Sequence, residues 1–185
     1  MTQAVTALPE KDYYPKVATW AEKQLGCFAT RTDTGLRHGR IDVVGLRDTG
    51  GTLSGRSEVI AIEVKRGTQP FATCVGQASG YSIYADRCYL AEFKPAGFSD
   101  DEQSIAARLG VGLIQISGSV RVAIREIMTA PLREPLEGLR LQVVEKVGYS
   151  MCTICHSFFL RGDDGSWGAN VVRQQRTRQR HIDTA

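Results

Sequence analysis

Apolar residues occur along this chain in short runs that polar and glycine-rich segments separate. The pattern predicts buried strands over residues 27–31, 40–46, 59–65, 87–93 and 111–116. Apolar residues three and four apart predict helices over residues 14–25 and 71–85. A third helix is marked at both ends, because Ser99 and Glu102 form a capping-box pair and Gly110 provides the stop. The predicted order is helix, three strands, helix, strand, helix, strand.

Polar segments between these elements predict the turns. Residues 33–35, Asp-Thr-Gly, are expected to turn the first strand toward the second, and residues 47–56 form a loop. The Ser-Gly-Ser turn at residues 117–119 leads into the alternating apolar residues 120–124. We therefore expect a hairpin at the end of this part of the chain.

The chain beyond the hairpin is expected to be an appendage. Pro131 and Pro135 bracket a linker, and residues 136–147 predict a short helix. The division that follows is a domain over residues 1–130, and a linker, a cysteine-containing element and a basic tail over residues 131–185.

Three charged residues stand inside the predicted apolar strands: Asp42 in the second, and Glu63 and Lys65 in the third. Such groups are normally paired, shifted in pKa or bound to a metal, because desolvating a charge is costly. Alternation places Ala61, Glu63 and Lys65 on one face of the strand, so we expect one face to pack and the other to carry chemistry. A salt bridge within the sheet is the structural alternative to a functional site.

The functional interpretation is a metal site at a strand edge. Two converging carboxylates, Asp42 and Glu63, suit Mg²⁺ or Mn²⁺, which take a few carboxylates together with water and substrate phosphate. Such an ion polarises a phosphoryl oxygen and lowers the pKa of a bound water. The Lys65 ammonium would neutralise developing charge or orient that water. The combination indicates hydrolysis of a phosphodiester bond.

The residues Gly39-Arg40-Ile41-Asp42, followed by Glu63-Val64-Lys65, resemble the motif of the PD-(D/E)XK nucleases. The resemblance covers residues 10–127, and it departs from the motif's name in having Ile41 where the proline stands. It implies an α/β fold with a restriction-endonuclease-like core, a mixed central sheet flanked by helices in the order αβββαβαβ. It also implies that Asp42, Glu63 and Lys65 are catalytic and that the backbone carbonyl of Val64 helps to hold the metal.

Two further elements of the same family have counterparts here. Gln77 and Tyr81 resemble a Gln-x-x-x-Tyr element, and their spacing places them on one helix face, where both could contact substrate. A glutamate from the first helix often joins the metal site in this family, and Glu10 and Glu22 are both candidates. Pro15 suits a first-turn position, which would put Glu10 just before the helix. We favour Glu10.

Composition and charge are compatible with a nucleic-acid-binding protein, but they do not by themselves indicate one. The chain has 185 residues, 42% of them hydrophobic, and a net charge of +3, typical of a soluble globular protein. Basic residues are concentrated in residues 171–185, which we interpret either as a solubilising tail or as an arm that contacts phosphates. No export signal or membrane-spanning run is apparent, so a cytoplasmic location and reduced cysteines are expected.

The pair Cys152 and Cys155 has the spacing of one zinc-ribbon knuckle, which suggests a structural Zn²⁺. A second such pair is missing from the sequence, so His181 and a fourth ligand from elsewhere would have to complete the site. Two reduced, packed cysteines are the alternative. Extension to His156 spells a haem-attachment pattern, but that attachment requires export.

The leading hypothesis is a Mg²⁺-dependent nuclease that acts on DNA in repair, recombination, restriction or the movement of mobile elements. The alternative is a catalytically silent module of the same fold that binds nucleic acid or a protein partner. Oligomeric state is left open, and a homo-oligomer is compatible with the sequence.

Overall fold

The computed structural model describes residues 7–49, 57–118, 121–152, 154, 157–161 and 167–170. Its centre is a six-stranded sheet in the order β1-β2-β3-β4-β5-β6. The strands are β1 (Cys27–Leu36), β2 (Gly39–Asp48), β3 (Ser57–Lys65), β4 (Arg87–Phe93), β5 (Gly112–Ser117) and β6 (Ala123–Met128). The neighbours β3, β4 and β5 are parallel, and the remaining pairs are antiparallel. The sheet is therefore mixed.

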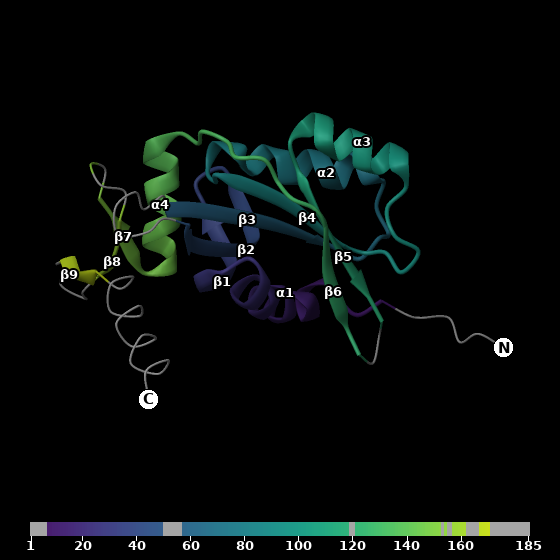
Figure 1. The fold of residues 1–185 in the computed structure, drawn as a ribbon, viewed down its shortest axis with the longest axis horizontal. Coiled ribbons are helices and arrows are strands. Elements are labelled where there is room, and N and C mark those ends of the chain that lie inside the picture. Colours follow the sequence, from purple (N-terminus) through teal and green to yellow (C-terminus); the bar gives the residue numbers. More distant parts are fainter. Residues whose placement is uncertain are drawn as a thin grey trace.

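Helices cover both faces of this sheet (Figure 1). They are α1 (Glu10–Gln24), α2 (Phe71–Gly80), α3 (Asp100–Leu109) and α4 (Glu137–Val147), with a short 3₁₀ helix, η1, at Tyr81–Ile83. Helix α1 packs on one face, while α2 and α3 pack on the other, over β4 and β5. This arrangement confirms the expected α/β fold class, with the order αβββαβαβ followed by β6 as the second strand of the hairpin.

The first helix begins at Glu10 rather than at Tyr14, so the expected position of Pro15 in its first turn is wrong. Proline lacks an N–H, and the carbonyl of Lys11 consequently loses its helical partner. Both Lys11 and Pro15 are exposed, which lets water satisfy that carbonyl. Glu10 and Asp12 lie in the first turn, where carboxylates interact favourably with the helix dipole.

The turn expected at residues 33–35 lies instead at Arg37 and His38. Strand β1 continues through the Asp-Thr-Gly segment, and Thr34 pairs with Ile41 of β2. Asp33 takes a left-handed conformation with φ of 55°, which aspartate tolerates better than most residues. The polar segment therefore lies within a longer hairpin rather than at its end.

The second helix, expected to reach residue 85, ends at Gly80 and passes into η1. Ser79 and Gly80 are weak helix formers, and the 3₁₀ turn tightens the chain before β4. Tyr81 thus sits at the junction between the two helices, which matters for where its hydroxyl points.

Helix α4 packs against the face of the same sheet opposite α1, through an apolar cluster that includes Val143, Val144 and Ala61. A buried ion pair anchors it: Arg140 Nε donates to Asp86 Oδ2 at 2.8 Å. A small three-stranded sheet of β7 (Tyr149–Met151), β8 (Phe158–Arg161) and β9 (Trp167–Asn170) follows. The division of the chain near residue 130 stays a prediction.

Candidate functional site

The geometry of the site begins where β2 and β3 separate. Their pairing ends, at this end of the strands, with Val43 opposite Ile62. Beyond this point a side chain of β2, not its backbone, bonds to β3: Asp42 Oδ2 accepts a hydrogen bond from the backbone N–H of Val64 at 2.9 Å. Ile41 and Val43 pack into different apolar clusters, so the strict alternation of β2 breaks at Asp42. The break directs this carboxylate toward the end of β3.

Glu63 and Lys65 form a buried ion pair at the end of β3. Lys65 Nζ lies 2.6 Å from Glu63 Oε1, and the two side chains are only 9% and 5% exposed. Tyr81 contacts the second oxygen, Glu63 Oε2, through its hydroxyl, which also lies 2.6 Å from the carbonyl oxygen of Arg40. Tyr81 therefore links the start of η1 and the start of β2 to the acidic residue of β3.

Helix α1 adds two side chains to the same cluster. The Tyr14 hydroxyl lies 2.7 Å from Asp42 Oδ1 and 3.5 Å from Glu10 Oε1. Glu10 Oε1 in turn lies 4.0 Å from Lys65 Nζ, and its side chain is 31% exposed. Solvent therefore reaches the cluster at Glu10. We call Glu10, Asp42 and Glu63, with Lys65, Tyr14 and Tyr81, the carboxylate cluster.

The electrostatics of this cluster favour added positive charge. Burial, reinforced by the negative charge of Glu63, raises the pKa of Asp42 to about 6, although hydrogen bonds from Val64 and Tyr14 oppose the shift. Burial also disfavours the charge on Lys65, but the hydrogen bond and charge of Glu63 outweigh it and raise the pKa of Lys65. Asp42 therefore ionises less readily than an ordinary aspartate.

Both faces of β3 pack, which corrects the expectation that one face is free for chemistry. Every residue from Ser57 to Lys65 is buried. Ile60 and Ile62 face α1, while Ala61, on the face of Glu63, packs in the cluster that includes α4. Only the end of that face carries charged side chains, Glu63 and Lys65.

The remaining predicted site residues separate into two groups. Tyr81 reaches the carboxylate cluster, whereas Gln77, four residues earlier, is exposed on α2. Glu10 lies at the cluster, whereas Glu22 accepts a hydrogen bond from Thr30 Oγ1 at 2.6 Å on the exposed surface of β1. The spacing of residues four apart predicted a shared helix face, but the end of α2 at Gly80 gives Tyr81 a different environment.

A polar row that the sequence reasoning missed runs across the sheet from Lys65. Lys65 pairs with Glu92, Glu92 with Gln115, and Gln115 with Arg125, on four successive strands. Glu92 is 2% exposed, and its Oε2 has no hydrogen-bond partner within the described structure. Burial raises its pKa. The signal was the one that identified Glu63, a carboxylate inside an apolar strand.

Tyr14 was missed as well. The available signal was its position four residues after Glu10, which places the two side chains on one helix face. Tyrosine on a predicted apolar stripe is ordinarily a core residue, and Tyr14 is indeed buried. Its hydroxyl, however, contacts the carboxylates of Asp42 and Glu10.

The donor set fits a hard divalent cation held by two carboxylates. Each of the four oxygens of Asp42 and Glu63 has one partner and keeps a second acceptor direction. The Val64 carbonyl is a further oxygen between the acid and the lysine. Among the described residues, no group of three or more His, Cys, Asp or Glu side chains is close enough to hold a metal ion by itself. Water and substrate oxygens would have to complete the coordination.

The predicted zinc ligands Cys155 and His181, and His156 beside them, lie outside the described residues. Cys152 is half-buried between β7 and β8, and its backbone N–H donates to the carbonyl of Ser157 at 3.0 Å. The structural Zn²⁺ therefore stays a prediction. Cys27, Cys74 and Cys88 are buried among apolar side chains, as expected for core cysteines.

No family model matches this chain, and no curated protein matches it. Among solved structures, the fold is similar to a chain from Pyrococcus furiosus described as "The structure of Pyrococcus Furiosus SfsA in complex with Ca2+". The two are 12% identical, the match covers 70% of this chain and 68% of that chain, and the TM-score is 0.37. Within the described residues, no helix is both long enough and apolar enough to span a membrane.

Proposed function

We propose that this protein is a metal-dependent nuclease that hydrolyses phosphodiester bonds in DNA. The observation that carries the proposal is the charge balance of the carboxylate cluster. Two buried carboxylates, Asp42 and Glu63, and the partly exposed Glu10 share the single ammonium of Lys65. An excess of buried negative charge is unfavourable unless a proton or a cation neutralises it. Mg²⁺ or Mn²⁺ supplies that charge with the oxygen ligands it prefers.

The roles follow from the contacts of each side chain. Asp42 and Glu63 would hold the ion together with the Val64 carbonyl, and Tyr14 and Tyr81 would keep the two carboxylates oriented. When bound, the ion polarises a phosphate oxygen and makes a bound water a better nucleophile. Lys65, released from Glu63, would stabilise negative charge that develops on the phosphate. Glu10, the more exposed acid, would lie where substrate enters, because solvent reaches the cluster there.

One observation favours the second candidate function, a catalytically silent module that binds nucleic acid or a protein partner. The Lys65 ammonium already neutralises Glu63 at 2.6 Å, so it competes with a metal ion for that carboxylate. If this ion pair is permanent, Glu63 cannot join Asp42 in holding a metal ion. The two functions differ in whether a divalent ion displaces the Lys65 ammonium from Glu63.

The test is cleavage of linear, circular, single-stranded and branched DNA with Mg²⁺ or Mn²⁺. Lys65→Ala and Asp42→Asn are each expected to lower the cleavage rate by roughly 10²- to 10³-fold, the loss typical when one electrostatic group of an active site is removed. Lys94→Ala is the matched control, because it breaks a lysine–carboxylate pair, with Glu102, outside the carboxylate cluster. Its cleavage rate should stay within a few-fold of wild type.

Two results decide between the functions. Mg²⁺-dependent cleavage that survives in Lys65→Ala would contradict the proposed roles. Absence of cleavage by the wild-type protein on every substrate, together with a Mg²⁺ affinity that Asp42→Asn does not change, would favour the silent module.

A further inference from the structure

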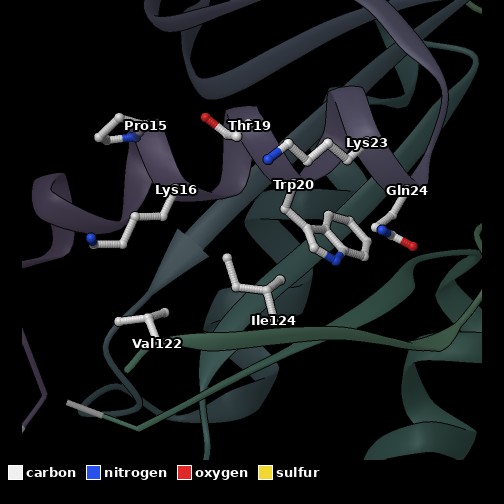
Figure 2. A pocket seen from close by; sticks show the side chains of 8 residues that line it. All are labelled: Pro15, Lys16, Thr19, Trp20, Lys23, Gln24, Val122 and Ile124. Atoms are coloured by element: carbon white, nitrogen blue, oxygen red, sulfur yellow. The ribbon is translucent and has the colours of Figure 1, made fainter. Parts of the chain in front are cut away.

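A second candidate site lies away from the carboxylate cluster, in a groove between α1 and the edge strand β6 (Figure 2). The groove has a volume of about 540 Å³, within the range of sites that take small organic molecules. Trp20 projects from α1 toward Ile124, and Lys16 and Lys23 come from the same helix. The sequence suggested no role for Trp20, because its partners lie about 100 residues away, on β6.

The floor and the rim of this groove differ in chemistry. The indole of Trp20 is half-buried and packs beside Val122 and Ile124 at the edge of the core that α1 covers. Lys16 and Lys23 are exposed, and no Asp or Glu is among the described residues that line the groove. The groove therefore combines an aromatic and aliphatic floor with two positive charges on its rim.

This combination selects the ligand class. Single-stranded nucleic acid is bound where positive charge follows the backbone and aromatic side chains stack against bases. A purely apolar ligand would leave both ammonium groups unused, and a second copy of this surface would bring four of them together against mutual repulsion. Phosphates on Lys16 and Lys23, with a base on Trp20, satisfy both parts of the groove.

We propose that the groove between α1 and β6 binds a segment of single-stranded nucleic acid. Its base packs on Trp20, and its phosphates contact Lys16 and Lys23. In so far as this segment belongs to a substrate, the inference rests on the proposed nuclease function. Helix α1 connects the two places: Tyr14 contacts the carboxylate cluster, and Trp20 follows after a rise of about 9 Å along the helix. A strand of several nucleotides is long enough to reach from one to the other.

The experiment measures binding without cleavage. It uses the full chain with Asp42→Asn in EDTA, and Trp167→Phe leaves Trp20 as the single tryptophan. The probe is a labelled single strand of about 12 nucleotides, a length within the range of known single-strand sites. Binding is followed by anisotropy of the label and by quenching of Trp20 fluorescence.

The expected results separate stacking from charge. Trp20→Ala should weaken binding about tenfold, and Trp20→Phe should weaken it less, because a smaller ring still stacks. Lys16→Gln and Lys23→Gln should each lower the slope of log affinity against log salt by about 0.7. Lys146→Gln is the matched control: it removes the same charge from an exposed position on α4, which packs on the other face of the sheet. It should leave the slope unchanged.

Several outcomes would overturn the proposal. These are an oligonucleotide that binds without quenching Trp20, an equal loss of affinity in Lys146→Gln, and a polyglutamate peptide that binds as tightly as the oligonucleotide. Quenching that depends on protein concentration alone would instead assign the groove to a second copy of the chain. Failure of the nuclease proposal is distinguishable, because it removes cleavage by the wild-type protein and leaves binding by the groove intact.

Discussion

Strand β3 carries a buried glutamate near each end, and the charged residues around the two glutamates differ in their balance of acids and cations. Near its start, Glu58 is 3% exposed and is paired with both Arg47 and Arg87. Asp86 lies beside it, accepts a hydrogen bond from the backbone N–H of Val59 at 2.7 Å, and is paired with Arg140. We call these five residues (Arg47, Glu58, Asp86, Arg87 and Arg140) the arginine cluster.

The charge balance of the two clusters differs in sign. The arginine cluster has three cations for two acids, and although burial opposes ionisation of Glu58, hydrogen bonds from Arg87 and Arg47 lower its pKa. The carboxylate cluster has one cation for three acids, and the pKa of Asp42 is raised to about 6. Buried charges that only stabilise a fold are neutralised within the protein. An uncompensated excess indicates a site that is completed by something else.

The largest expected effect tests whether the arginine cluster is structural. Arg140→Met leaves Asp86 buried without its cation, which should lower the free energy of unfolding by about 3–5 kcal/mol. Urea denaturation measures this change, and Lys65→Met provides the matched substitution at the other end of β3. Because Lys65→Met also unpairs a carboxylate, a smaller loss there, in protein that stays folded but does not cleave DNA, would sharpen the contrast. Equal losses of unfolding free energy in the two variants would show that the two clusters do not differ in this way.

A pH series tests the excess charge at Asp42. The folded protein holds the Asp42 proton more tightly than the unfolded chain, since its pKa is about 6 instead of the ordinary 3.8. The contribution of Asp42 to stability is therefore fully present below about pH 4 and is lost as the pH rises to about 6, at most about 3 kcal/mol. The measurement is the free energy of unfolding from pH 4 to 8 without divalent ions. The free energy of unfolding of wild type, taken relative to that of Asp42→Asn, should fall as the pH rises from 4 to about 6. A difference that does not change with pH would contradict the raised pKa of Asp42.

Divalent ions should act on one cluster only. At ten times its dissociation constant, Mg²⁺ is expected to stabilise the folded protein by about 1.4 kcal/mol, measured as a rise in Tm. Asp42→Asn should abolish the rise, whereas Asp101→Asn, which removes an exposed carboxylate from α3, should keep it. An identical rise in both variants would indicate binding elsewhere.

The smallest expected effect concerns Gln77. Because this side chain is exposed and lies outside the carboxylate cluster, Gln77→Ala should change the free energy of unfolding by less than about 0.5 kcal/mol. Tyr81→Phe removes the hydroxyl that contacts Glu63 and should lower cleavage more than Gln77→Ala does. The reverse order in a cleavage assay would show that the substrate is contacted along α2 rather than oriented through Glu63.

The sequence predicted the elements of the sheet well because strands and capped helices leave local signals. The capping box of Ser99 and Glu102 is formed, and the helix ends at Gly110 in a left-handed conformation. Predictions failed where neighbours outside the segment decide the conformation. The Asp-Thr-Gly segment at residues 33–35 has turn chemistry, yet pairing with β2 keeps it in the strand. The same limit applies to Pro15, whose position in the helix depends on where the chain before it begins to turn.

By itself, the sequence determined that three charged residues occupy apolar strands and that helices and strands alternate in the order of an α/β fold. These properties follow from residue type and period, which are local. Only the tertiary structure decided that Asp42 turns toward Val64, that Tyr14 and Glu10 join the acids, and that Glu92 continues the row from Lys65. It also placed Trp20 against Ile124. Contacts between distant segments depend on strand register and helix packing, and the arrangement of the whole sheet sets both.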